Sequence, residues 1–537
     1  MFRELRRRIT IAKDKKIPAN LVFCKEKFTY DNIEELKQDV GLKIGNIVEL
    51  NGYYTAGDGA NHKRVIANED DGSGVQLANG LWANVVHNGE VNVSWFGAKG
   101  DGVTDDTETI QKAINYSNVS ILDCNKIYCI TNTVFVKSRG KTLTSFPSSE
   151  RGMATIRYIG ETNNKKAVIV VGINDVGEFN LDCTANVLSN LQIDANNLCG
   201  LGVYSTYCTN ETRIENIITS NTLEYGMYFA KVWYATFRNL VSKNSKGNGI
   251  AFGMELRFSD RTVIKPNGEY EDIIQINNAF IDNLRAHTCG KETNSQDDKY
   301  GYGIGIGKGY SLTVTKMLSE NCGIGILVKR TSGYSFKISD FYCEGNTKGF
   351  ILDTRNTKEF NVLIGTISNG YIKGKFIHIN GDNEKNNNGK ILLENIFPTE
   401  YSRLDYNNIL SLRNCGGELN YGKQPMNLAF GSTLRLKENV DLRYSGEFNT
   451  KLPLIQVSRK ILYFISEKEY TNVVGSFFVK DINGSNLSSY AFPSVIKKGI
   501  NFVRDIPVDS YKLDLAVTPK ESIVVDLLVL GSNSTYY

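Results

Sequence analysis

Hydrophobic residues in the middle of the chain occur in short groups that are separated by polar turns. When these groups are aligned by the turn that follows each one, a repeat extends from about residue 167 to residue 397. Two intervals between central apolar residues, 217 to 240 and 318 to 341, are 23 residues long. A coil of this length cannot bury its apolar side alone, so successive coils must stack to make a continuous core. The pattern therefore predicts a β-solenoid. The aligned central residues are Ile217, Leu240, Leu284, Leu318 and Phe341.

The longer intervals in this repeat contain two inserted loops, at residues 255–275 and 291–300. Each apolar group is followed by an Asn/Gly turn and then by a glycine with a new apolar segment, as in YGMYF and NGIAF. Asn216, Asn239 and Asn283 recur just before the central apolar residue. Asparagine in such a position is typical of a turn, so we expect one turn-stabilising asparagine in each coil.

Both ends of the chain depart from this repeat. Residues 21–92 alternate short apolar groups with polar turns and contain one possible helix at 32–42, which indicates a small separate module. After residue 422 alternating strands such as SIVVDLLVLG return, which indicates a compact β-sandwich over residues 423–537. The predicted fold is therefore all-β, with the solenoid at residues 93–422 and a basic peptide at residues 1–20.

A glycine-rich motif, WFGAKGDGVTDDTETIQKAI, begins at Trp95. Its three glycines permit tight backbone turns, and Asp105 is placed to cap a helix that begins near Thr107. The motif lacks the GxxxxGK[ST] spacing of a phosphate-binding loop. It resembles the first segment of the pectate-lyase-like right-handed parallel β-helix superfamily, especially phage tailspikes and capsule depolymerases. The resemblance implies that the helix closes the N-terminal end of a right-handed parallel β-helix.

The same resemblance implies a function and an assembly. Proteins of this type are expected to be elongated homotrimers that bind and cleave a bacterial capsular or O-antigen polysaccharide. The peptide at residues 1–20 would dock on another phage tail protein, and residues 423–537 would trimerise the chain or bind carbohydrate. The protein would then belong to the virion and assemble in the host cytoplasm. A non-catalytic receptor-binding fibre is the alternative, and a secreted pectin-degrading enzyme is disfavoured because no signal peptide is evident.

Composition narrows these possibilities. Lys plus Arg is 62 and Asp plus Glu is 58, so the net charge of +4 indicates no general affinity for nucleic acid or membrane. No apolar run reaches the 18 residues expected of a membrane span. The ten cysteines form no CxxC pair, and we expect reduced, mostly buried thiols. Without an HExxH motif, a Cys/His cluster or an EF-hand loop, no metal or other cofactor is expected.

Hydrolysis of a glycan needs a protonated carboxylic acid and a second carboxylate, about 5 Å away for retention or about 6.5–9.5 Å away for inversion. Equivalent positions of neighbouring coils stack about 4.8 Å apart, so acids on successive coils can meet this requirement. Glu320 and Glu344 follow the aligned Leu318 and Phe341 by two and three residues. They are candidate catalytic residues, although an ordinary turn-capping role is an alternative.

The inserts offer a second set of candidates, because long insertions in a solenoid project on one face and aromatic rings can stack on sugars. A merely solvated loop is the alternative. The candidate catalytic residues here are Glu255, Asp260 and Asp272, near Glu269 and Glu271, and the candidate substrate-binding residues are Arg257, Phe258 and Tyr270, with Tyr300 and Tyr302 from the second insert near Asp297 and Asp298.

A lyase acting on a uronate-containing glycan is the alternative chemistry. Such an enzyme needs a base that removes the proton next to the carboxylate and cations that neutralise the charge. His287, with Arg285 nearby as a substrate-binding residue, is the candidate for this role. A structural histidine at a coil turn is the simpler interpretation.

Overall fold

A computed structural model describes most of the chain from residue 28 onward. The continuous described segments are residues 28–148, 152–172, 184–206, 210–259, 276–291, 300–329, 335–353, 364–379 and 390–404, with residues 263–264, 410–413 and 418–420 and separate strands between residues 433 and 532. The chain divides into two compact units, one of residues 1–99 with 108–121 and one of residues 100–107 with 122–537.

A five-stranded sheet and one short helix form the core of the first unit. The strands lie in the order β1-β2-β3-β5-β4, and β1 pairs with β2 in parallel whereas the other pairs are antiparallel. Helix α2 (Ile33–Lys37) begins after Asn32, whose side chain accepts a hydrogen bond from the N–H of Glu35. The predicted helix is therefore confirmed but shorter. The five strands are β1 (Phe28–Tyr30), β2 (Ile47–Leu50), β3 (His62–Ala67), β4 (Val75–Gln76) and β5 (Trp82–Val85). A further strand, β6 (Glu90–Asn92), lies outside this sheet and pairs in parallel with β8 (Val119–Leu122).

The glycine-rich motif folds as its sequence predicts. It contains a 3-10 helix, η2 (Val93–Phe96), the strand β7 (Asp101–Asp105) and the helix α3 (Thr107–Tyr116). Gly97, Gly100 and Gly102 all have positive φ, at 98°, 60° and 79°. Asp105 accepts a hydrogen bond of 3.0 Å from the N–H of Thr107, as expected of a residue that caps the helix.

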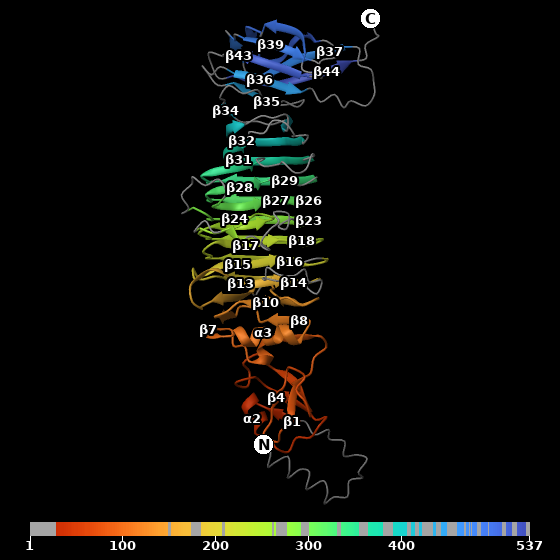
Figure 1. The fold of residues 1–537 in the computed structure, drawn as a ribbon, viewed down its shortest axis with the longest axis vertical. Coiled ribbons are helices and arrows are strands. Elements are labelled where there is room, and N and C mark those ends of the chain that lie inside the picture. The colour runs from red at the N-terminus through yellow and green to blue at the C-terminus, as the bar shows by residue number, and fades with distance from the viewer. Residues whose placement is uncertain are drawn as a thin grey trace, which may run out of the picture. The chain divides into compact units, whose positions relative to one another are not determined.

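Parallel strands stack coil upon coil in the second unit, as Figure 1 shows. One stack, which we call the first face, carries four of the five predicted central apolar residues on its inner side, with Leu318 as the exception. The register pairs Leu284 with Met317 and Met317 with Phe341. The predicted alignment of Leu318 was therefore one residue too late. The first face contains β14 (Val187–Asp194), β16 (Arg213–Ser220), β19 (Thr236–Lys243), β24 (Phe280–His287), β27 (Leu312–Glu320), β29 (Ser335–Glu344), the first parts of β31 (Ile364–Ile379) and β32 (Lys390–Leu404), and β33 (Leu410–Arg413).

A second stack, the second face, contains the glycine-plus-apolar segments. Gly226, Gly249, Gly303 and Gly325 occupy one column of it. A Cβ atom at Gly249 would lie 2.3 Å from the carbonyl oxygen of Gly303, so close stacking excludes a side chain there. The second face contains β10 (Val134–Val136), β13 (Asn163–Gly172), β15 (Cys199–Thr206), β17 (Tyr225–Ala230), β20 (Asn248–Phe252), β25 (Tyr302–Ile306), β28 (Ile324–Lys329), β30 (Lys348–Asp353) and the end of β31.

An asparagine ladder runs along the first face. The side chain of Asn216 donates to Asn190 at 2.9 Å, Asn239 donates to Asn216 at 2.7 Å, and Asn283 donates to Asn239 at 2.7 Å. Each of these residues has φ between 54° and 58°. The prediction of one turn-stabilising asparagine in each of these coils is confirmed.

Two four-stranded antiparallel sheets follow the solenoid in the sequence, in the orders β35-β44-β37-β42 and β36-β43-β39-β40. They lie within residues 423–537, for which the sequence predicts a β-sandwich. The strands of these two sheets are β35 (Thr433–Leu436), β36 (Leu442–Glu447), β37 (Arg459–Ser466), β39 (Gly475–Lys480), β40 (Asn486–Ala491), β42 (Gly499–Ile506), β43 (Lys512–Val517) and β44 (Ile523–Ser532). Two short strands, β38 (Tyr470–Thr471) and β41 (Val495–Ile496), pair with each other in a separate sheet.

Shorter strands complete the solenoid. One small parallel sheet joins three coils in the order β18-β23-β26, and β21 pairs with β22 inside the first predicted insert. The remaining strands are β8 (Val119–Leu122), β9 (Ile127–Ile130), β11 (Thr142–Ser145), β12 (Ala154–Tyr158), β18 (Val232–Trp233), β21 (Leu256–Arg257), β22 (Val263–Ile264), β23 (Ile276–Asn277), β26 (Gly309–Tyr310) and β34 (Glu418–Asn420).

Candidate active site

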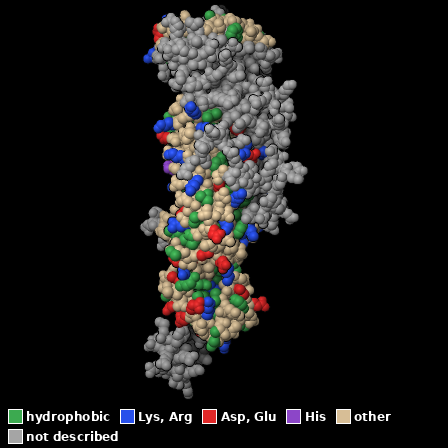
Figure 2. All heavy atoms as spheres, turned by 60° about the vertical axis from the view of Figure 1, so that its left-hand side comes forward, with side chains coloured by type: hydrophobic (Ala, Val, Ile, Leu, Met, Phe, Trp, Pro, Cys, Tyr) green, Lys and Arg blue, Asp and Glu red, His purple; other side chains and the backbone are tan. Residues whose placement is uncertain are grey.

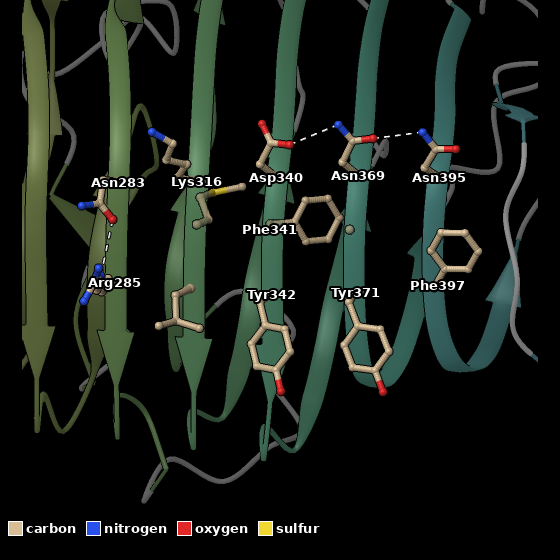
Figure 3. A pocket seen from close by; sticks show the side chains of 13 residues that line it. Asn283, Arg285, Lys316, Asp340, Phe341, Tyr342, Asn369, Tyr371, Asn395 and Phe397 are labelled. Carbon is tan, nitrogen blue, oxygen red and sulfur yellow. Dashed lines mark hydrogen bonds between the residues drawn. The ribbon is translucent and has the colours of Figure 1, made fainter.

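A hollow of about 610 Å³ lies on the outer side of the first face, over β24, β27, β29, β31 and β32. Successive strands contribute equivalent residues, so its lining is arranged in columns (Figure 3). One column continues the asparagine ladder and another contains aromatic side chains. The lining residues are Asn283, Arg285, Lys316, Met317, Leu318, Asp340, Phe341, Tyr342, Asn369, Gly370, Tyr371, Asn395 and Phe397.

Three aromatic rings follow one another in the outer column. Tyr342 pairs in register with Tyr371, and Tyr371 pairs with Phe397. The rings of Tyr342 and Tyr371 are stacked, with their centroids 5.6 Å apart and an interplanar angle of 16°. Tyr371 is 46% exposed and Phe397 is 41% exposed. Exposed ring faces in a row provide an apolar surface on which sugar rings can lie.

Two carboxylates lie in register beside this aromatic row. Glu320 pairs with Glu344, and His287 of the preceding coil pairs with Glu320. His287, Glu320 and Glu344 each come two positions after a residue that lines the hollow. Side chains two positions apart in a strand point to the same face, so all three point outward with that residue. The structure thus brings together four predicted site residues, which are Arg285, His287, Glu320 and Glu344.

Glu344 is held as an ionised carboxylate. It lies 2.6 Å from Nζ of Lys373 and accepts a 2.6 Å hydrogen bond from the hydroxyl of Tyr342. Lys373 contributes most to lowering the pKa of Glu344, and the hydrogen bond from Tyr342 also lowers it. The same hydrogen bond raises the pKa of Tyr342 to about 12. Glu344 is therefore suited to act as a base or nucleophile rather than as a proton donor.

Glu320 is differently placed, since its carboxylate makes no hydrogen bond or ion pair with any residue that the structure describes. Its carboxylate is therefore available to contact a substrate in the hollow. His287 lies next to it in the column, and Nδ1 of His287 is 2.8 Å from Oγ1 of Thr288.

The insert candidates that the structure describes lie elsewhere, on the outer side of the second face. Phe258 and Tyr302 are only 2% and 1% exposed, and Tyr300 is also buried. Glu255 lies 3.7 Å from both Arg257 and Lys329. Rings packed in a core have no face open to a sugar, so the predicted role of Phe258, Tyr300 and Tyr302 in substrate binding does not fit their positions. Asp260, Asp272 and Tyr270, with Glu269, Glu271, Asp297 and Asp298, lie outside the described residues.

Glu224 is a buried carboxylate that the sequence reasoning missed. It accepts hydrogen bonds from the N–H of Ser259 at 2.9 Å, from the hydroxyl of Ser259 at 2.5 Å, and from the hydroxyl of Tyr300. Burial raises the pKa of the Tyr300 hydroxyl, with a further contribution from Glu224. Because Ser259 and Tyr300 belong to different predicted inserts, Glu224 ties both to the same coil. Its position just before a glycine-plus-apolar segment was the available signal.

Tyr342, Tyr371, Phe397 and Lys373 were also missed. Their signal was their spacing, since each aromatic residue directly follows an inner apolar or glycine residue of the repeat. Within the described residues, no group of three or more His, Cys, Asp or Glu side chains is arranged to hold a metal ion. No helix in the described part of the chain is long and apolar enough to span a membrane.

Comparison with known proteins agrees with this architecture. Residues 90–137 match the family model of rhamnogalacturonase A/epimerase, pectate lyase-like. The tailspike protein of Acinetobacter phage vB_ApiP_P1 is similar in structure, with a TM-score of 0.51 and 12% identity over 94% of this chain and 98% of that chain. The chain has the pectate-lyase-like β-helix fold. The predicted resemblance to phage tailspikes is confirmed at the level of this fold.

Two other tailspikes match this chain at lower structural similarity. The enzymatically active domain of tailspike protein 4 from bacteriophage CBA120 has a TM-score of 0.43 and 12% identity, over 97% of this chain and 80% of that chain. The tailspike gp49 from Acinetobacter baumannii bacteriophage Fri1, a capsular polysaccharide depolymerase, has a TM-score of 0.39 and 12% identity, over 94% and 100%. No curated protein sequence matches this chain.

Proposed function

We propose that this pectate-lyase-like protein is a phage tailspike depolymerase that binds and hydrolyses a bacterial surface polysaccharide in the hollow of the first face. The observation that carries the proposal is the in-register pair Glu320 and Glu344, which lies beside the half-buried ring of Tyr342 and the exposed rings of Tyr371 and Phe397. The pair supplies acid and base groups, and the rings supply a binding surface for the sugar next to them.

The proposed roles follow from the surroundings of each carboxylate. Glu344, kept ionised by Lys373 and Tyr342, acts as nucleophile, and Glu320 protonates the leaving oxygen. Positions in register on neighbouring coils are about 4.8 Å apart. That spacing favours a retaining mechanism, for which the two carboxyl groups are about 5 Å apart.

Purified capsular polysaccharides from a panel of encapsulated strains provide the test. Wild-type protein should release new reducing ends from one of them without new absorbance from unsaturated uronate. Glu320→Gln and Glu344→Gln should each lower the rate at least about 100-fold, the lower end of general acid–base contributions. Both variants should still bind the polymer. Glu255→Gln, on the second face, is the matched control and should retain activity. Cleavage that survives both active-site changes would refute the assignment.

A lyase is the second candidate, favoured by the position of His287. Its side chain shares the outer face with Arg285 on the same strand and pairs in register with Glu320. If cleavage produces unsaturated uronate and His287→Gln abolishes it, His287 is the base and the hydrolase assignment is wrong. Binding of one polysaccharide without any cleavage would instead indicate a non-catalytic fibre.

The assembly of the chain is also a proposal. We infer a homotrimer that joins another phage tail protein through residues 1–20, in a virion assembled in the host cytoplasm. The support is the tailspike fold and the basic sequence of that peptide. Light scattering of the purified protein should give three times the chain mass of 59.9 kDa. A monomeric mass would contradict the trimer.

A further inference from the structure

In two adjacent coils of the hollow, a cation replaces the type of residue that the rest of its column contains. One cation stands in the outer column and the other in the asparagine ladder. The outer column, followed from β16 to β32, consists of Ile218, Val241, Arg285, Leu318, Tyr342, Tyr371 and Phe397. Arg285 is the one charged residue among these seven. The residues at equivalent positions of the adjacent coils are apolar or aromatic, so packing within the column does not call for a charged side chain at position 285.

Arg285 is poised to bind an anion. Its side chain is exposed and lines the hollow, and its Nε donates one long hydrogen bond of 3.4 Å to Oδ1 of Asn283. It forms no ion pair with any residue that the structure describes. The planar guanidinium therefore keeps most of its donors available for a bidentate contact with a carboxylate.

The asparagine ladder is interrupted next to Arg285. Lys316 and Asp340 occupy the ladder positions between Asn283 and Asn369, as the line of side chains in Figure 3 shows. The ladder resumes beyond them, because Asn369 donates to Asp340 at 3.1 Å and Asn395 donates to Asn369 at 3.0 Å. Lys316 exposes 68% of its side chain, and its ammonium is 3.9 Å from Asp282. A ladder hydrogen bond is thus replaced by a second cation that lines the hollow.

Arg285 and Lys316 outnumber the acidic side chains that line the hollow, since Asp340 is the one carboxylate among its lining residues. On the face that Figure 2 shows, basic and acidic side chains are interspersed over the part of the solenoid that the structure describes. Two cations in adjacent coils of one hollow, next to three aromatic rings, are a local feature of the proposed site rather than a consequence of net charge.

We propose that the hollow selects an acidic glycan, with a sugar carboxylate bound by Arg285 and Lys316 while the neighbouring residue lies on Tyr342 and Tyr371. This inference rests on the proposed function, since it assigns the substrate class of the same site. Arg285 makes the bidentate contact, and Lys316 adds a point charge that Asp282 partly neutralises. The sugar carboxylate is a uronate or another acid substituent of the repeating unit.

The test uses the same panel of purified capsular polysaccharides, both native and after chemical reduction of their carboxyl groups to primary alcohols. Binding is measured to wild-type protein, Arg285→Gln and Lys316→Gln. The matched control is Arg213→Gln, an exposed arginine on β16 outside the hollow. A further variant, Tyr371→Ala, removes an aromatic ring while keeping both cations.

We expect the bound polysaccharide to be acidic. Carboxyl reduction and Arg285→Gln should each weaken binding at least about tenfold, as expected when a charge-assisted hydrogen bond is lost. Arg285→Gln should have no further effect on the reduced polymer. Lys316→Gln should have a smaller effect than Arg285→Gln, and Arg213→Gln should have none.

Different failures overturn different claims. Binding of a neutral polymer, or of an acidic polymer whose affinity survives carboxyl reduction or Arg285→Gln, would overturn the acidic-glycan inference and leave the proposed function standing. If Tyr371→Ala leaves the affinity unchanged, the hollow is not the binding site and both claims fail. Both claims also fail if wild-type protein binds none of the polymers.

Discussion

The two outer faces of the solenoid use similar residues for opposite purposes. On the first face Tyr371 is 46% exposed, whereas on the second face Tyr302 is 1% exposed. The difference comes from what covers each face. Leu256 and Phe258 of the first insert pack over the second face together with Met254, which directly precedes the insert. The hydroxyl of Tyr228 donates to the carbonyl of Met254 at 2.7 Å. An aromatic residue in a solenoid column is therefore a binding candidate only where no insert covers it.

The largest expected change in stability comes from removing the aromatic ring of Tyr302, which the first insert covers. Tyr302→Ala should lower the free energy of unfolding by roughly 3–5 kcal/mol, because truncating a buried aromatic leaves a cavity in the core beneath the insert. Urea unfolding followed by circular dichroism measures the change. A loss below about 1 kcal/mol would mean that the insert does not seal the second face.

Replacing Glu224, which holds both inserts, should lower the free energy of unfolding by a smaller amount. Glu224→Leu removes the acceptor for Ser259 and Tyr300 and should cost about 1–3 kcal/mol, because it leaves the buried hydroxyl of Tyr300 unpaired. Limited proteolysis should then cut within residues 255–275 and 291–300 sooner than in wild-type protein. Glu255→Leu is the control, because Glu255 is only partly buried and its loss should leave the rate of proteolysis unchanged.

On the first face, which none of the described insert residues covers, removing an aromatic ring should weaken glycan binding more than it lowers the free energy of unfolding. Tyr371→Ala should change the free energy of unfolding by no more than about 0.5 kcal/mol, as is usual for surface positions. It should nevertheless weaken glycan binding by roughly tenfold, through loss of apolar contact with a sugar face. The comparison of the two faces would break down if Tyr371→Ala were as destabilising as Tyr302→Ala.

The smallest expected effect is a shift in pH dependence. Lys373 lowers the pKa of Glu344, so Lys373→Met should raise that pKa. Glu344 must be ionised to act as nucleophile, and activity falls as the pH drops through its pKa. The acidic limb of the cleavage profile should therefore move to higher pH in Lys373→Met and stay in place in Lys337→Met, which changes an exposed lysine of β29. An unmoved limb in Lys373→Met would exclude Glu344 from that titration.

Much of the fold could be predicted from the sequence, because each coil of a solenoid needs the same kinds of residue at its turns and at its closely packed positions. The turn asparagines Asn216, Asn239 and Asn283 and the glycines of YGMYF and NGIAF each recur for one steric or hydrogen-bonding reason. The glycine-rich motif at residues 95–114 was similarly informative, since its turns and helix cap are local.

The site was predicted only in part. Glu320 and Glu344 could be paired because they follow the repeat, and their alignment was correct to within one residue. The aromatic row and the burial of Phe258 and Tyr302 depend on which face an insert covers, and this is a long-range contact with no local signal. The pairing of Glu344 with Lys373 likewise joins two coils and could not be inferred from composition or spacing within one segment.

The most direct test of the account is a crystal structure of the Glu320→Gln variant with an oligosaccharide prepared from the polysaccharide that the protein binds. We predict sugar rings along Tyr342, Tyr371 and Phe397, with a glycosidic oxygen near residue 320 and the anomeric carbon facing Glu344. Sugar bound over the second face, or away from the hollow, would contradict it.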